Sequence, residues 1–98
     1  MEIQSIYVSQ RKLRAPEQLV DMIRELEDGG TLPPIVLTRD ENGTTQVQDG
    51  HHRLTAIWLS GRQHLRPQEF LLVESERSRP RFGTVTDLLC RCGLGGDS

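Results

Sequence analysis

The sequence has few aromatic residues, which make up 4% of its 98 residues. Trp58 is its only tryptophan, so we expect a hydrophobic core built mostly from Val, Ile and Leu, with that indole as its one large ring. A chain of this length forms one domain, residues 1–98. It can bury about 60–68% of its unfolded surface, which is enough for one modest core.

The chain also has no excess of positive charge, because the formal net charge is -2, and Lys12 is its only lysine. A domain that holds nucleic acid by bulk electrostatics usually carries a marked basic excess, so this balance argues against that class. The other basic residues are arginines, which suit bidentate contacts to phosphate or carboxylate. A G+C-rich coding sequence would also favour arginine over lysine, so a binding role and codon composition both stay open as explanations.

Long apolar runs are missing, since no segment approaches the roughly 20 residues that span a membrane. The first residues are acidic and polar, unlike a signal peptide. Cys90 and Cys92 are the only cysteines, and two residues so close in sequence make neither a disulfide framework nor a zinc site. We expect a reduced, cytoplasmic protein without a metal site, and the role of the two thiols stays open.

The hydrophobic pattern predicts an α+β fold, with a mixed, roughly four-stranded sheet and two main helices. The expected strands are residues 3–8, 35–38, 44–48 and 70–73, and the main helices are 16–28 and 53–59. Asn42-Gly43 predicts a hairpin turn between the second and third strands. Residues 9–15 are expected to be a polar, basic connector.

The C-terminal part of the chain is expected to be less regular. A last short helix would carry Val85, Leu88 and Leu89 after a threonine cap at Thr84 or Thr86. It would be followed by a flexible tail at residues 93–98, so that helix and tail together make up residues 84–98, and the core lies at about residues 3–75. The alternating arginines at 77, 79 and 81 indicate a solvated segment more than a nucleic-acid contact.

The run at residues 49–53, Asp-Gly-His-His-Arg, stands between an expected strand and an expected helix. A helix N-terminus offers unpaired N–H groups and a positive dipole end, which together favour an anion such as phosphate. Gly50 would let the backbone approach a ligand, and His51, His52 and Arg53 would supply side-chain donors. Asp49 would either orient a ligand or Mg²⁺, or cap the helix, and its role stays open.

A purely structural explanation of the same run also stays open. In it, one histidine is buried with its polar atoms satisfied, and Arg53 pairs with an acid. Arg14, on the connector before the first helix, could reach the same cleft in the functional interpretation.

The run also carries a family resemblance. Residues 30–36, residues 47–56 and Gly61 together resemble the ParB/sulfiredoxin superfamily, whose fold is a small α+β domain. Sulfiredoxins match at Gly50, His52 and Arg53, but their catalytic cysteine would fall at His51, so their repair chemistry is not expected. Partition ParB proteins bind CTP through a Gly-Glu-Arg-Arg box that is matched in position by residues 50–53.

Within that superfamily, the residues of the motif are most similar to those of the ParB-like free serine kinases. The resemblance implies a nucleotide (ATP, ADP or CTP) with Mg²⁺, Asp49 as a catalytic residue, and Glu17 as the nearest candidate for the base. The expected function is nucleotide or phosphate binding, with phosphotransferase or NTPase activity. The alternative is a non-catalytic, nucleotide-gated module that contacts DNA or a protein partner.

Overall fold

The secondary structure alternates short strands with helices, as the sequence predicts. The computed structural model describes residues 1–74 and 80–91. The elements are the 3-10 turn Ile3–Ser5, β1 Ile6–Tyr7, α1 Gln18–Glu27, β2 Ile35–Arg39, β3 Thr45–Asp49, α2 His51–Leu59, the 3-10 turn Pro67–Glu69, β4 Phe70–Glu74 and α3 Val85–Arg91. The predictions for Arg77, Arg79, Cys92 and the tail at 93–98 lie outside the described residues.

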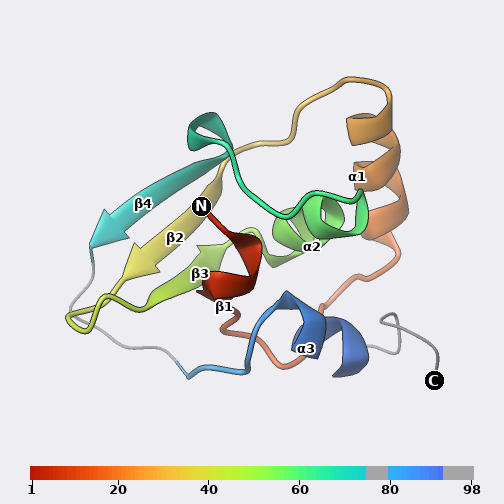
Figure 1. Ribbon diagram of the computed structural model, residues 1–98. Coiled ribbons are helices and arrows are strands. Elements are labelled where there is room, and N and C mark those ends of the chain that lie inside the picture. The colour runs from red at the N-terminus through yellow and green to blue at the C-terminus, as the bar shows by residue number, and fades with distance from the viewer. Residues whose placement is uncertain (75–79, 92–98) are drawn as a thin grey trace.

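The four strands form one mixed sheet in the order β1-β3-β2-β4 (Figure 1). β2 and β3 pair antiparallel at its centre, while β1 runs parallel to β3 and β4 runs parallel to β2. The structure is therefore an α+β fold with a four-stranded mixed sheet, which confirms the predicted fold class.

The tight turn between β2 and β3 forms where the Asn-Gly pair predicts it. Asp40 Oδ1 accepts hydrogen bonds from the backbone N–H groups of Asn42 and Thr44, at 2.9 and 3.0 Å. Gly43 has a φ of 79°, in the left-handed region that glycine tolerates best. The aspartate thus holds the turn from its first residue, as Asp commonly does in such loops.

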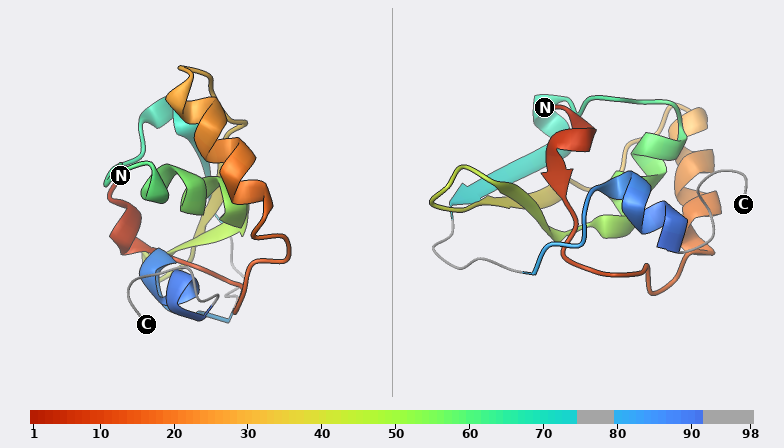
Figure 2. Two further views of the ribbon diagram at one scale, coloured as in Figure 1. Left: turned by 90° about the vertical axis from the view of Figure 1, so that its right-hand side faces the viewer. Right: turned by 60° about the horizontal axis from the view of Figure 1, so that its bottom comes forward.

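The helix α2 lies between the sheet and α1, and α3 packs beside it near the N-terminal turn (Figures 1 and 2). The core is aliphatic, as the scarcity of aromatic residues predicts. Its fully buried side chains include Ile6, Ile35, Leu37, Val47 and Leu54. This packing fixes the direction of α2, and therefore the position of its first turn.

The predicted strand at residues 3–8 is wrong in its extent, because only Ile6 and Tyr7 pair with β3. The hydrogen bonds of its neighbours go to other segments. Ile3 N–H donates to Gln63 O, and Val8 exchanges both backbone hydrogen bonds with the segment at residues 82–83. Its partners therefore change from one end to the other, so a continuous strand does not form.

Two helix starts also differ from prediction. α1 begins at Gln18 rather than at Pro16, since residues 15–18 form a separate turn in which Gln18 N–H donates to Ala15 O. α2 begins at His51, two residues before the predicted start, so both histidines belong to its first turn. In the part of the chain that the structure describes, no helix is both long and apolar enough to cross a membrane.

Candidate functional site

The junction between β3 and α2 consists of a single residue, Gly50. Its φ is 106°, which L side chains rarely adopt. A Cβ atom there would lie 3.1 Å from Nε and Nη2 of Arg53 and 3.2 Å from Cγ2 of Ile35. Glycine therefore allows the strand to turn directly into the helix and lets the Arg53 side chain lie close against the turn.

The first turn of α2 has no side-chain cap. Gly50 is the N-cap residue, and its carbonyl accepts the first helical hydrogen bond, from Leu54 N–H at 2.9 Å. The capping role left open for Asp49 is therefore wrong. Instead, Asp49 Oδ2 accepts a hydrogen bond from Arg53 Nη2 at 3.2 Å, in a pair whose side chains are 74% and 17% exposed respectively.

His51 is buried, with 5% of its surface exposed. Its Nε2 accepts the backbone N–H of Ser9 at 3.0 Å. Because a nitrogen that accepts a hydrogen bond carries no proton, the neutral ring holds its proton on Nδ1. Ser9 is fixed a second time, since its hydroxyl donates to Val47 O at 2.7 Å. His51 therefore joins the first turn of α2 to the segment that follows β1.

His52 makes the matching contact six residues further along the same segment. Its Nε2 accepts the backbone N–H of Ala15 at 3.1 Å. The two adjacent imidazoles thus hold both ends of residues 9–15, which we call the anchored loop. Two parts of the structural explanation are seen: one histidine, His51, is buried and hydrogen-bonded, and Arg53 pairs with an acid.

The anchored loop is packed as well as hydrogen-bonded, although the sequence predicts a polar connector. Leu13 is 5% exposed and belongs to a core cluster with Leu19 and Leu88. From the same helix as Leu88, α3, the guanidinium of Arg91 donates to the backbone carbonyl of Arg11. The loop is therefore a fixed wall, and its exposed cations, including Arg14, project from a supported backbone.

A pocket of about 310 Å³, which we call the N-terminal pocket, opens beside the first turn of α2. It is lined by Gln10, Arg14, Met22, Gln48, Asp49, Gly50, His51, His52 and Arg53. Six of the seven residues predicted for the site therefore line one pocket. Glu17, the candidate base, precedes α1 and is not among the lining residues.

Sequence reasoning missed three lining residues, Gln10, Met22 and Gln48. Gln48 adjoins the motif, so its position was a usable signal. Gln10 and Met22 come from the anchored loop and from α1, and nothing in their local pattern indicates this pocket. Gln10 Oε1 is buried and has no hydrogen-bond partner among the described residues, which is uncommon for a buried acceptor.

The pocket's charge balance favours an anion, since Arg14 and Arg53 outnumber Asp49. Among residues 1–74 and 80–91, no three His, Cys, Asp or Glu side chains gather as metal ligands do. A cation in the pocket would therefore have Asp49 as its only carboxylate ligand from the lining residues.

Comparisons with known proteins add no relative. No protein-family profile, curated protein or solved structure matches this chain. The resemblance to the ParB/sulfiredoxin superfamily stays a prediction from the motif residues, and the functional argument depends on the geometry of the pocket.

Proposed function

We propose that the N-terminal pocket binds the phosphate end of a nucleotide or of another phosphorylated small molecule, as a member of the ParB/sulfiredoxin superfamily would. The observation that carries the proposal is the convergence of Arg14 and Arg53 on the uncapped N-terminus of α2. Backbone N–H groups, a helix dipole and two guanidinium groups then face the same space. Each of these features favours an anion.

Arg53 can accept a phosphate at little cost. Its present partner, Asp49, is largely exposed, and ion pairs of that kind contribute only about 0–1 kcal/mol. A phosphate can form a bidentate contact with the same guanidinium, which is a stronger arrangement. Asp49, released from Arg53, would then be available to orient a hydroxyl group or to hold Mg²⁺.

The two histidines support this function chiefly through the anchored loop. Because their Nε2 atoms accept hydrogen bonds from Ser9 and Ala15, those atoms are not donors to a phosphate. They instead fix the loop that carries Arg14, so that little order has to be gained when a ligand binds. Contact of the partly buried His52 with phosphate through Nδ1 remains part of the proposal.

The size of the pocket bears on the ligand. A volume of about 310 Å³ is near the lower limit of ligand pockets, which run from roughly 300 to 1,000 Å³. It suits a phosphate group with an attached sugar better than a complete nucleotide. We therefore expect ATP, ADP and CTP to bind with similar affinity, with the base largely outside the pocket.

Two functions remain, and one observation favours the binding module. Among the described residues, Asp49 is the only carboxylate that lines the pocket, because Glu17 lies outside the set of lining residues. A phosphotransferase or NTPase would depend on Asp49 and Mg²⁺ for positioning and charge neutralisation. A nucleotide-gated module that contacts DNA or a protein partner needs only the anion site.

A thermal-shift panel tests both functions. Wild-type protein is heated with ATP, ADP or CTP, each with and without Mg²⁺. A ligand at a hundredfold excess over its dissociation constant adds about 2.7 kcal/mol of stability. If none of the nucleotides raises the melting temperature, the phosphate-site proposal fails. Release of phosphate, or its transfer to a hydroxyl acceptor such as serine, would identify an enzyme, whereas binding without turnover would identify the module.

A further inference from the structure

A second and larger pocket, which we call the C-terminal pocket, lies at the other end of α2. Its volume is about 410 Å³. It is lined by Leu26, Glu27, Gly29, Gly30, Thr31, Leu32, Pro33, Ile57, Ser60, Arg62, Arg66, Gln68 and Glu69. The residues come from the end of α1, the connection to β2, the end of α2 and the segment before β4. None of them lines the N-terminal pocket.

One wall of the C-terminal pocket is a fixed ion pair. Arg62 donates to both carboxylate oxygens of Glu69, at 2.7 and 3.2 Å, and also to His64 O at 2.9 Å. Glu69 Oε1 accepts a further hydrogen bond from the backbone N–H of Arg66 at 2.7 Å. The charges of Arg62 and Glu69 therefore cancel within a rigid bidentate contact.

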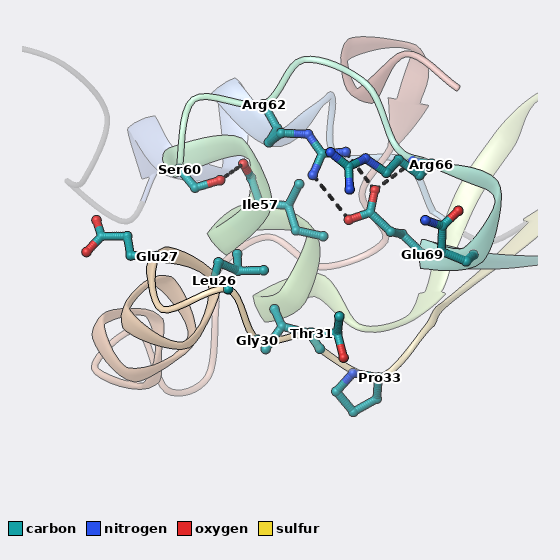
Figure 3. A pocket seen from close by; sticks show the side chains of 13 residues that line it. Leu26, Glu27, Gly30, Thr31, Pro33, Ile57, Ser60, Arg62, Arg66 and Glu69 are labelled. Atoms are coloured by element: carbon teal, nitrogen blue, oxygen red, sulfur yellow. Dashed lines mark hydrogen bonds and ion pairs between the residues drawn. The ribbon is translucent and has the colours of Figure 1, made fainter.

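Among the described residues, the guanidinium of Arg66 has no paired carboxylate, because Glu69 forms its ion pair with Arg62. Figure 3 shows the Arg62 and Arg66 side chains together on one side of the pocket, next to the Glu69 carboxylate. Within the described part of the chain, no carboxylate pairs with the Arg66 guanidinium. Glu27, the other acid of the lining, is exposed, and its carboxylate points away from the two arginines in Figure 3. The lining holds two arginines and two glutamates, so its charges balance as a whole, but the arginine side presents one guanidinium, that of Arg66, without a paired carboxylate in the described ranges.

The opposite side of the pocket is apolar. Leu26, Leu32, Pro33 and Ile57 line it, and Ile57 is only 2% exposed. Figure 3 places Leu26 and Pro33 across from the arginine pair, with Ile57 between them and Arg62. An apolar surface facing a single cation matches a ligand with an apolar body and one anionic group. A guanidinium is suited to a carboxylate, which it can contact with two parallel hydrogen bonds.

We propose that the C-terminal pocket is a second binding site, for a small amphipathic carboxylate whose acid group contacts Arg66 and whose apolar body lies on Leu26, Leu32 and Ile57. The site is independent of phosphate binding at the other end of α2. The two pockets share the helix and differ in their ligands, since the N-terminal pocket has Met22 as its one large apolar side chain.

Amide chemical shifts in NMR spectra test the site with hexanoate as the probe. We expect saturable shifts at Gly29, Gly30, Thr31 and Ser60, and weaker binding of acetate, which lacks the apolar body. Hexylamine, which has the same body and the opposite charge, should bind much more weakly than hexanoate. Equal binding of hexylamine, or no saturable shift with hexanoate, would overturn the proposal.

Matched arginine variants complete the test. R66Q should weaken hexanoate binding about tenfold, as the loss of a charge-assisted contact implies. R66K should keep part of the affinity, and R24Q, which removes an exposed arginine that lines neither pocket, should bind as the wild type does. Unchanged affinity in R66Q would contradict the site. Because phosphate is expected to shift the amides at residues 50–53 instead, either proposal can fail without the other.

Discussion

His51 Nε2 accepts the backbone N–H of Ser9 at 3.0 Å, although 42 positions separate the two residues in the chain. Ala15 N–H makes the corresponding contact to His52. The two histidines, which look like ligands in the sequence, therefore support the anchored loop. This relationship connects the fold to the proposed site, because the same loop carries Arg14.

Replacing His51 by Phe should destabilise the protein. The substitution keeps an aromatic ring in the buried position but leaves the Ser9 N–H without its acceptor. A buried donor left unpaired costs about 1–3 kcal/mol, and we expect a loss of that size in urea unfolding. His64→Phe, at an exposed position, is the matched control. A His51→Phe variant that unfolds at the same urea concentration as wild type would show that the contact is not important.

Replacing His52 by Ala should act locally. His52 is only partly buried, so the global stability should change less than in His51→Phe. The Ala15 amide, which loses its acceptor, should exchange its hydrogen about three- to tenfold faster, as a bond of about 1 kcal/mol implies. The Ser9 amide, held by His51, serves as the internal control. Unchanged exchange at Ala15 would contradict the anchoring role.

Replacing Gly50 by Ala should weaken both the fold and the site. The positive φ alone costs about 1–2 kcal/mol for a residue with a Cβ. The new methyl group would also press on Arg53 and Ile35. Gly61→Ala is a close control, because its φ is 99° and nothing lies within 4 Å of its Cβ position. We expect Gly50→Ala to be the less stable variant in thermal unfolding, and equal stabilities would argue against a tight junction.

Acid should remove the stabilisation that comes from Glu69. Burial raises the pKa of this carboxyl, but hydrogen bonds from the Arg62 side chain and the Arg66 backbone N–H, with the positive charges of both arginines, lower it by more, so the net pKa lies below the usual value. A carboxyl with a lowered folded-state pKa stabilises the protein above its unfolded pKa, about 4.3 for Glu. That contribution is lost as the pH falls through the lower folded-state pKa.

Glu69→Gln measures this contribution directly. Its melting temperature should be below that of the wild type near neutral pH, and the difference should shrink as the pH falls below about 4. Glu41→Gln, at an exposed position in the hairpin turn, should show no such convergence. A Glu69→Gln difference that is constant from neutral to acid pH would contradict the role assigned to the ion pair.

The main outlines of the fold could be predicted from the sequence because they depend on local patterns. The Asn42-Gly43 turn and the β-favouring residues on either side of it predicted the central hairpin, and Gly50 marked the change from strand to helix. The N-terminal strand could not be predicted correctly. Only its middle pairs with β3, while the hydrogen bonds of its two ends go to residues near positions 63 and 83, which the tertiary structure brings there.

In the candidate site, too, the local features could be predicted from the sequence and the long-range contacts could not. Adjacent residues 49–53 could be grouped from sequence, and Arg14 lines the same pocket as they do. The acceptor roles of His51 and His52 were not specified, because their donors are backbone groups more than 35 positions away in sequence. The C-terminal pocket had no local motif, since it combines residues from four separate segments.

The most direct test of the phosphate-site proposal is an NMR titration with inorganic pyrophosphate. Wild-type amides at Gly50, His52 and Arg53 should shift saturably, Arg53→Gln should bind about tenfold more weakly, and Arg24→Gln should bind as the wild type does. If these amides do not shift in the wild type, or if Arg53→Gln binds pyrophosphate with unchanged affinity, the N-terminal pocket is not a phosphate site.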